Sequence, residues 1–441
     1  MASPVRLHAR LVSSEIHLET VFWYVNDRHA DVFWLDSGPH AHEGWSLVGW
    51  GKQEKHPERI LAVPAAEQNT PDAALPPFTG GWVGWWSYET GRELRNNREG
   101  VNTRSTDGSA WLAVRQAVAI NHATGAVWAL AGIDDIEAWA DEVEATIALG
   151  SRATPDLDRD ALIAAEARHS AAEYTALVRA CMAAIARADV AQLCPTTTFT
   201  VPGQHCSAEI YGRLRSAMSA PHGGYVRVDA TGLASASPEQ FLRISGTTVH
   251  SSPIKGTRPR DADPHRDQAL ADELRNSRKE REENELITAG LQQQLASVCV
   301  PASVHRGQQQ QIHSYATVHQ LVSTVQGTLR ADVSVRELLA AVFPAASMTG
   351  APQSAAMSLL HEAEAGPRGV YSGCFGYIGA RGGMNLGMVI RSVVVTATEA
   401  TVGAGGGITA LSDPDAETAE VALKAQGPLA AVGARVPWDL G

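Results

Sequence analysis

Residues 237–258, SPEQFLRISGTTVHSSPIKGTR, contain the two short motifs from which the fold prediction starts. The tripeptide Ser237-Pro238-Glu239 predicts a corner between two strands, near 224–235 and 240–250. Sixteen residues further on, Lys255 lies in a segment bounded by proline and glycine, which predicts a short rigid turn. A lysine is a nucleophile only as the free amine, so a catalytic Lys255 would need a pKa lowered by desolvation or nearby positive charge. A solvated turn lysine without a chemical role is the alternative.

The composition limits the class of protein. A chain of 441 residues with 44% hydrophobic content can bury a large core, as two or three domains or as one large α/β body. Its net charge of −12 argues against nucleic-acid binding, although a local basic pocket for a small dianion is compatible with it. The five cysteines have no CxxC spacing, which favours reduced thiols over disulfides or a zinc site. With no signal-peptide pattern and no run of about eighteen apolar residues, we expect a cytoplasmic protein without membrane segments.

The chain divides by composition near residue 150. Residues 1–150 hold short aromatic and β-branched runs, such as 21–25 and 31–35, which predict a strand-rich N-terminal subdomain. An Ala- and Glu-rich stretch from about 133 leads to a surface connection, and 151–441 forms the second region. In that region the patterns predict helices at 171–187, 264–298, 333–343, 352–364 and 414–425, and strands at 189–201, 370–377 and 386–396.

The last predicted helix carries Glu417, Glu420 and Lys424 on one face, because they are spaced i, i+3 and i+7. The glycine-rich run 403–407 comes just before it. Consecutive glycines let backbone N–H groups approach an anion closely, and the helix N-terminus adds a favourable dipole. The pattern indicates a site for a magnesium-bound carboxylate, and an exposed stripe of charges is the alternative.

Carboxylates from two helices would suit magnesium, which prefers oxygen ligands. The candidate magnesium ligands are Glu283, in the charged helix 264–298, and Glu420. The sequence has no cluster of His and Cys residues of the kind that binds zinc. Arg391 lies in the apolar stretch Met388-Val-Ile-Arg-Ser392, where a buried guanidinium needs an anionic partner. That partner is either a substrate carboxylate or a structural salt bridge.

These motifs occur in the order and spacing of the chorismate-utilising enzymes, which the chain resembles over residues 170–430. The shared motifs are Ser237-Pro238-Glu239-Gln240-Phe241-Leu242, Pro253-Ile-Lys-Gly-Thr257, Glu283-Asn284, Leu321-Val-Ser-Thr324, Phe343-Pro344, Ser347-Met-Thr-Gly-Ala-Pro352, Gly376-Tyr377, Ile390-Arg391 and Gly405-Gly-Gly-Ile408. The resemblance implies an α+β fold like that of anthranilate synthase component I. In that fold two large antiparallel β-sheets pack face to face, with helices outside and the active site between them.

Two positions favour one branch of this family. Branches that add water to chorismate carry a lysine base where this chain has Gln192, so isochorismate and salicylate synthases are disfavoured. Lysine in the Pro-Ile-x-Gly-Thr motif is typical of aminodeoxychorismate synthase component I, whereas anthranilate synthases usually carry alanine. The resemblance therefore implies that Lys255 attacks C2 of chorismate and that ammonia then displaces it at C4. The product would be 4-amino-4-deoxychorismate, on the route to 4-aminobenzoate and folate.

The resemblance also implies roles for the other motif residues. Glu239 would transfer protons near Lys255, and Glu283, Glu420 and Glu417 would hold Mg²⁺. The residues implied in substrate binding are Arg391, Tyr377, Lys424, Gly405, Gly406, Gly407, Thr257 and Gln192. Because no glutaminase motif is found in the chain, a separate glutamine amidotransferase subunit is expected to supply ammonia.

Some positions depart from the family pattern. Gln320 stands where the family has histidine, and His319 precedes it, on the opposite side of a predicted strand. Residues 287–294 lack the charges usual after Glu283-Asn284. Two alternatives to the aminodeoxychorismate branch therefore stay open: an anthranilate or aminodeoxyisochorismate-type synthase, and a catalytically impaired chorismate-binding or regulatory protein.

Overall fold

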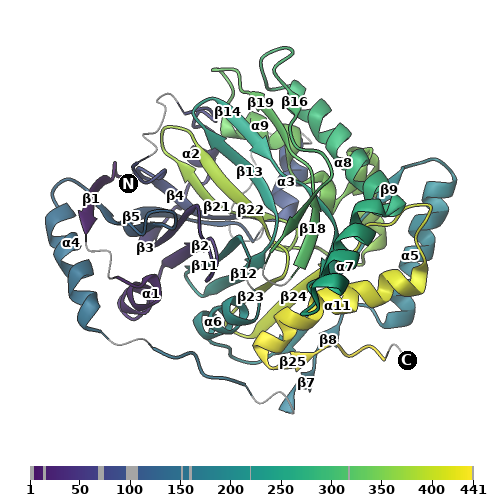
Figure 1. Ribbon diagram of the computed structural model, residues 1–441, viewed down its shortest axis with the longest axis horizontal. Helices are drawn as coiled ribbons and strands as arrows, with labels where there is room; N and C mark the ends of the chain where they lie inside the picture. The colour runs from purple at the N-terminus through teal and green to yellow at the C-terminus, as the bar shows by residue number, and fades with distance from the viewer. Residues whose placement is uncertain are drawn as a thin grey trace.

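The computed structural model describes residues 4–12, 16–67, 74–95, 108–149, 152–157, 161–218, 220–315 and 318–439. The helices are α1 (Leu18–Asn26), α2 (Glu58–Leu61), α3 (Tyr88–Arg95), α4 (Ile136–Ala145), α5 (Ala171–Ala186), α6 (Ser207–Ala217), α7 (Pro264–Asn276), α8 (Arg278–Ala296), α9 (Val335–Val342), α10 (Gln353–Ala363) and α11 (Pro414–Val432). Figure 1 shows them around the outside of a large body of strands.

Eighteen strands join in one antiparallel network with two arms. The first arm runs β8 (Glu166–Ala167), β10 (Thr196–Pro202), β24 (Glu399–Gly405), β23 (Ser392–Val395), β12 (Thr231–Ser237), β11 (His222–Val228), β2 (Val32–Asp36), β3 (Trp45–Gln53), β5 (Ala110–Asn121), β6 (Val127–Ala131) and β1 (His8–Val12). The second arm leaves β5 through β4 (Gly81–Trp86) and continues with β21 (Cys374–Gly379), β22 (Met384–Met388), β13 (Gln240–Ser245), β14 (Thr248–Ser251), β19 (Val325–Thr328) and β16 (His305–Arg306). The long strand β5 belongs to both, because β4 and β6 pair with opposite ends of it.

Small sheets complete the strand inventory. Antiparallel β15 (Ile254–Pro259), β18 (Val318–Val322) and β17 (Gln311–Ser314) form a three-stranded sheet against α7 and α8. Two-stranded pairs are made by β9 (Gln192–Leu193) with β20 (Gly350–Ala351) and by β7 (Ile163–Ala164) with β25 (Ala434–Arg435).

The inner faces of the two arms pack on each other. One buried cluster combines Phe33 and Val226 of the first arm with Trp85 and Phe375 of the second. A second cluster covers the outer face of the first arm with α1, α4, α5, α6 and α11, and a third covers the other arm with α2, α3, α8 and α9. This confirms the predicted α+β fold of antiparallel sheets packed face to face with helices outside.

The N-terminal strands are built into both arms. Strand β2 pairs with β11, and β4 pairs with β21, so strands from either side of residue 150 share each sheet. The division at that residue stays a prediction. All five cysteines are free, as expected. In the described parts of the chain, no helix combines the length and apolar character needed to cross a membrane.

Among the predicted helices and N-terminal strands, two were wrong. Residues 21–25 form helix rather than strand, because Leu18, Val21, Phe22 and Val25 are buried at helical spacing. The predicted helix 264–298 is two helices that break at Ser277, whose side chain accepts a hydrogen bond from the backbone of Glu280 and so caps α8. The other predicted helices are confirmed as α5, α9, α10 and α11, and the last of them extends to Val432.

Candidate active site

Lys255 lies on β15, not in the predicted turn. The strand pairs with β18 and carries a bulge between Lys255 and Thr257. Between them Gly256 has φ +77°, and a Cβ there would lie 2.6 Å from the side chain of Leu274, so the position favours glycine. Bulges commonly re-aim a side chain, and here the Nζ atom of Lys255 donates to the carbonyl oxygen of Ser347 at 3.2 Å.

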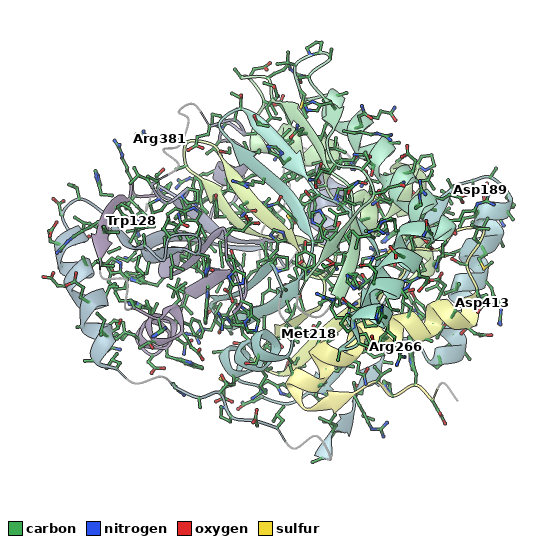
Figure 2. All side chains as sticks on the ribbon, viewed as in Figure 1. Trp128, Asp189, Met218, Arg266, Arg381 and Asp413 are labelled. Atoms are coloured by element: carbon green, nitrogen blue, oxygen red, sulfur yellow. The ribbon has the colours of Figure 1, made fainter. Side chains whose placement is uncertain are left out.

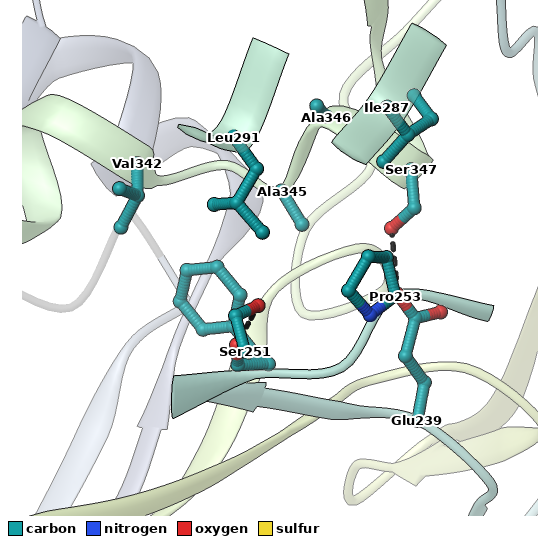
Figure 3. Close-up of a pocket in the computed structure, with 10 residues that line it drawn as sticks. Glu239, Ser251, Pro253, Ile287, Leu291, Val342, Ala345, Ala346 and Ser347 are labelled. Atoms are coloured by element: carbon teal, nitrogen blue, oxygen red, sulfur yellow. Dashed lines mark hydrogen bonds between the residues drawn. The ribbon is translucent and has the colours of Figure 1, made fainter. Parts of the chain in front are cut away.

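Glu239 lies beside the same serine. Figure 3 shows the hydroxyl of Ser347 pointing at the Glu239 carboxylate, to which it donates at 2.9 Å. Both residues line a small cavity of about 20 Å³ whose other walls are mostly apolar, including Ile287 and Leu291 of α8. Burial raises the pKa of Glu239 to about 7, although Lys255 and the serine hydroxyl act in the opposite direction. A carboxyl group with this pKa can both give and accept a proton near neutral pH.

The charge state of Lys255 is set by its acidic neighbours. Burial, the largest single influence, would lower the pKa of Lys255, but Glu283, Cys194, Glu239 and Glu280 together outweigh burial and raise the pKa above its ordinary value. The protein without substrate therefore holds Lys255 as an ammonium. The lowered pKa that a nucleophilic lysine needs is absent from this state, so a neighbouring base must take the proton before attack.

Gly407 is the point where the predicted residues converge. A Cβ built on it would lie 2.9 Å from Gln192 Nε2, 2.9 Å from Glu283 Oε2 and 3.4 Å from Lys255 Nζ. Both amide atoms of Gln192 and the Oε1 atom of Glu283 are buried, with no hydrogen-bond partner among the described residues. Buried polar groups are nearly always paired in native proteins. Their arrangement around a glycine fits a polar ligand held against the backbone of the 405–407 run.

Two of the three carboxylates predicted to hold magnesium, those of Glu283 and Glu417, lie within 4 Å of Lys279. Its Nζ atom lies 2.6 Å from Glu417 Oε1 and 3.9 Å from Glu283 Oε1. Burial, the largest single influence, would lower the pKa of Lys279, but the hydrogen bond to Glu417 and the nearby negative charges together outweigh it and raise the pKa. Glu283 and Glu420 add to that increase. The acidic groups of α8 and α11 therefore meet at one cation.

The carboxylate oxygens of Glu283, Glu417 and Glu420 are of the kind that magnesium prefers. Glu283 Oε1 has no hydrogen-bond partner among the described residues, and Lys279 Nζ lies 3.9 Å from it. Over the described residues, no three His, Cys, Asp or Glu side chains are gathered closely enough to hold a metal ion. The magnesium site stays a prediction.

Glu283 and Glu420 differ in their surroundings. Burial raises the pKa of Glu283 to about 7 against the attraction of Lys255 and Lys279. Attraction to Lys424 lowers the pKa of Glu420 to about 2, and the two side chains form an ion pair at 2.7 Å. One carboxyl is thus poised to exchange a proton near neutral pH, and the other is a fixed negative charge.

Helix α11 brings Lys424 back to the glycine run. Asp413, labelled in Figure 2, caps the helix by accepting hydrogen bonds from the backbone of Asp415 and Ala416. Lys424 Nζ donates to the carbonyl oxygen of Gly405 at 3.1 Å. Arg391 contacts the backbone of the same lysine, with its Nη1 atom 3.5 Å from the carbonyl oxygen of Lys424. The two cations can bind a carboxylate next to the glycines.

Arg391 interrupts the strand predicted at 386–396. It has φ +51° and separates β22 from β23. Burial lowers its pKa, while Tyr371 and Glu420 act in the opposite direction. No salt bridge to Arg391 is formed within the described residues, which leaves its charge available to a ligand.

The structure gives two predicted binding residues different surroundings, and their roles stay predictions. Tyr377 is in the core between the two arms, with its ring 5.3 Å from that of Phe78. Thr257 is exposed on β15. The tyrosine that lies by Arg391 and the glycine run is Tyr371, because a Cβ on Gly403 would lie 2.1 Å from its ring. The analysis of the sequence missed Tyr371, although the arginine and glycine motifs already marked this part of the site.

Gln320 and His319 point to different surroundings. His319 Nε2 lies 2.9 Å from Asp267 of α7, and its Nδ1 lies 2.7 Å from Ser314 of β17. These contacts hold the imidazole on the α7 side of the small sheet. Gln320 is buried, and its Oε1 atom has no partner in the described part of the chain. The histidine therefore does not replace the missing acid at position 320.

Comparison with known proteins gives one consistent family. A family model described as chorismate binding enzyme matches residues 30–430. The chain is 38% identical over 391 residues to an aminodeoxychorismate synthase of Streptomyces pristinaespiralis, which covers 86% of this chain and 54% of that protein. It is 30% identical over 453 residues to anthranilate synthase component 1 of Streptomyces coelicolor, which covers 97% of this chain and 89% of the relative.

A solved structure agrees with the fold. The crystal structure of anthranilate synthase component I from Streptococcus pneumoniae superposes with a TM-score of 0.71 at 19% identity, covering 97% of this chain and 93% of that one. At this identity the likeness establishes the fold alone. The chain spans about half the length of the aminodeoxychorismate synthases from Streptomyces that it matches.

Proposed function

Because the chain belongs to the family of chorismate binding enzymes, we propose that it converts chorismate and ammonia to 4-amino-4-deoxychorismate, as an aminodeoxychorismate synthase. The observation that carries this proposal is the position of Lys255. Its ammonium lies next to Glu283, Gln192 and the backbone of Gly407, where a ligand would contact it. A lysine placed at a ligand-binding surface and flanked by carboxyls can act as a nucleophile once it is deprotonated.

In the first half of the reaction, a carboxylate takes the proton of Lys255. Glu239, with its pKa raised to about 7, is suited to this step. The amine then forms a bond to C2 of chorismate, both conjugated double bonds of the ring shift, and the C4–oxygen bond breaks. The leaving hydroxide takes up a proton and departs as water. Glu239, hydrogen-bonded to Ser347, is placed to return that proton.

In the second half, ammonia forms a bond to C4, both ring double bonds shift back, and the C2–nitrogen bond breaks. The lysine nitrogen takes up a proton as it leaves and is again a free amine, and the proton lost by the attacking ammonia passes to a carboxylate. Glutamine at position 192 cannot activate water as a lysine would, so ammonia rather than water is the expected nucleophile. Lys424 and Arg391 would bind the carboxylates of chorismate beside Gly405.

Magnesium belongs to this proposal as well. Glu283, Glu417 and Glu420 would hold it, and it would neutralise the charge of a substrate carboxylate. We propose that the protein acts in the cytoplasm and that its product serves the synthesis of 4-aminobenzoate and folate. Two of the similar proteins are named component 1 or I of their enzymes, which supports a glutamine amidotransferase as the source of ammonia.

One other reaction has support. The anthranilate synthase component 1 from Streptomyces coelicolor aligns with nearly the whole chain, so amination at C2 is the second candidate, with the aminodeoxyisochorismate type as its variant. Gln320 is the observation behind a third candidate, a chorismate binder with little activity. The lysine at position 255 favours amination at C4 over both.

Product analysis decides among them. The protein is incubated with chorismate, Mg²⁺ and high ammonium, with and without a lyase that releases 4-aminobenzoate from 4-amino-4-deoxychorismate. Lyase-dependent 4-aminobenzoate is the expected result. Anthranilate without the lyase would show amination at C2 instead. No consumption of chorismate, even with an amidotransferase added, would contradict both synthase assignments.

A further inference from the structure

Arg368 uses every N–H of its guanidinium inside the protein. Its Nε atom donates to Glu364 Oε2 at 2.8 Å, and Nη2 donates to Glu364 Oε1 at 2.6 Å and to the carbonyl of Cys194 at 2.9 Å. The Nη1 atom donates to the carbonyl of Met348 at 2.6 Å and to the hydroxyl of Ser372 at 3.4 Å. These are the five donors that an arginine has.

The carboxylate of Glu364 is equally engaged. Besides its two bonds with Arg368, Glu364 Oε1 accepts from the backbone N–H of Thr196 at 2.9 Å and from its hydroxyl at 3.0 Å. The exposed fractions of the two charged side chains are 1% for Arg368 and 4% for Glu364. The guanidinium also stacks over Tyr88 at 4.3 Å. The ion pair is therefore enclosed and fully hydrogen-bonded.

The segments that meet at this ion pair are those that form the candidate active site. Met348 follows Ser347, which contacts both Lys255 and Glu239. Cys194 comes two residues after Gln192. Thr196, bound to the carboxylate, is the register partner of Gly405 across β10 and β24. One buried ion pair thus links the loop of Ser347, the segment that follows Gln192, and the glycine run 403–407.

We infer that Arg368, together with Glu364, is a positioning residue for the proposed reaction: it fixes the loop of Ser347, and through it Lys255 and Glu239, relative to the glycine run. This inference rests on the proposed function. Arg368 touches no predicted substrate group, so its effect is indirect. A guanidinium is required because a lysine ammonium has three donors and cannot reach Glu364, Met348 and Cys194 in the same fork geometry.

A buried ion pair does not by itself indicate a functional role, since breaking one destabilises any fold. The distinguishing feature is its partners. If the ion pair served only stability, its two side chains would make their hydrogen bonds with each other and with backbone close to them in the sequence. Here the remaining donors bind the carbonyls of Met348, next to Ser347, and of Cys194, two residues after Gln192, and these two segments are far apart in the sequence.

The test compares Arg368→Lys with Arg168→Lys. Arg168 is the matched control. Its guanidinium also donates to backbone carbonyls, those of Gly366 at 3.4 Å and Pro367 at 2.7 Å, which lie just before Arg368 in the chain. Two quantities are measured for each variant: kcat for the ammonium-dependent reaction, and the rate at which Lys255 is reductively methylated, read from peptide masses. The second readout needs no turnover, so it tests the inference even if the proposed function fails.

In Arg368→Lys we expect kcat to fall about 10- to 100-fold, the effect of a small misplacement of reacting groups. Methylation of Lys255 should become several-fold faster, while thermal unfolding stays cooperative. Arg168→Lys should stay within about twofold of the wild type. If Arg368→Lys does not fold, Glu364→Gln, which keeps an acceptor for Thr196, is judged by the same criteria. Values of kcat and Lys255 labelling that match those of Arg168→Lys would overturn the inference.

Discussion

Lys255 and Ser347 are joined by a hydrogen bond of 3.2 Å from the lysine ammonium to the serine carbonyl. The hydroxyl of the same serine donates to Glu239. A single residue on the loop between α9 and β20 therefore contacts both groups that we propose to carry out the chemistry. This loop therefore sets the distance between Lys255 and Glu239. A change that moves the loop would displace both side chains.

The raised pKa of Glu239 predicts a pH-dependent effect on stability. The folded state holds the proton up to about pH 7, whereas the unfolded chain releases it near pH 4.5. Stability from this group is therefore present at low pH and is lost as pH rises from about 4.5 to 7, a loss of about 3 kcal/mol. Glu239→Gln does not titrate. The free energy of unfolding of the variant minus that of wild type, measured in urea, should thus be about 2–3 kcal/mol larger at pH 8 than at pH 5.

The same variant should lose about 10²- to 10⁴-fold in rate, since it cannot exchange a proton. A stability difference between Glu239→Gln and wild type that is equal at pH 5 and pH 8 would show that burial does not control this carboxyl group.

Gly407→Ala tests the convergence of the site on the glycine run. The added methyl group would press on Gln192 and Glu283 at 2.9 Å, and both contacts are ends of side chains that can move. We expect a folded protein with chorismate affinity weakened about 10- to 100-fold, the equivalent of roughly 1–3 kcal/mol of overpacking. Calorimetric titration with chorismate measures it.

Gly290→Ala is the control for that substitution. Gly290 lies within α8, and a Cβ there meets nothing within 4 Å. Alanine should leave chorismate binding unchanged and raise stability by up to about 1 kcal/mol. Equal chorismate affinities in the two variants would remove Gly407 from the binding surface.

Lys279→Met tests whether Lys279 stands in for a divalent cation. Without its ammonium, Glu283 and Glu417 lose their shared counter-ion. Affinity for Mg²⁺ should rise roughly tenfold, equivalent to about 1.4 kcal/mol. Arg278→Met is the control, because Arg278 pairs with Glu282 on the exposed side of the same helix. Calorimetry with Mg²⁺ alone gives the readout, and an affinity that is unchanged or weaker in Lys279→Met speaks against the stand-in role.

The fold and the membership of the site were largely accessible from the sequence. The motifs around Glu239, Glu283 and Gly407 predicted residues that the structure brings together, and the sheet arrangement was predicted with them. One helix start was predicted correctly: the helix expected from residue 414 begins at Pro414, after the N-cap residue Asp413. The break at Ser277 was signalled by the same chemistry, since Ser277 precedes Glu280 by three residues, but the continuous charge pattern concealed it.

What could not be predicted depends on pairing between distant segments. Lys255 pairs with Leu321 across β15 and β18, a contact that no local pattern contains, so a bulged strand was taken for a turn. The choice between Tyr371 and Tyr377 has a similar origin. Both lie on or just before β21, and only the packing of the two arms decides that Tyr377 faces the core. The charge of Lys255 likewise follows from carboxyls that the fold assembles around it.

The central claim is that Lys255 forms a covalent bond with chorismate. It is tested most directly by mixing the protein with chorismate and Mg²⁺ without ammonia, quenching the reaction in acid, and mapping the modified peptide by mass spectrometry. We predict an adduct on Lys255 with the mass of chorismate less one water, absent from Lys255→Ala and removed when ammonium is added before the quench. A wild-type protein that aminates chorismate while Lys255 stays unmodified at every quench time, or a Lys255→Ala variant that aminates C4 at the wild-type rate, would contradict it.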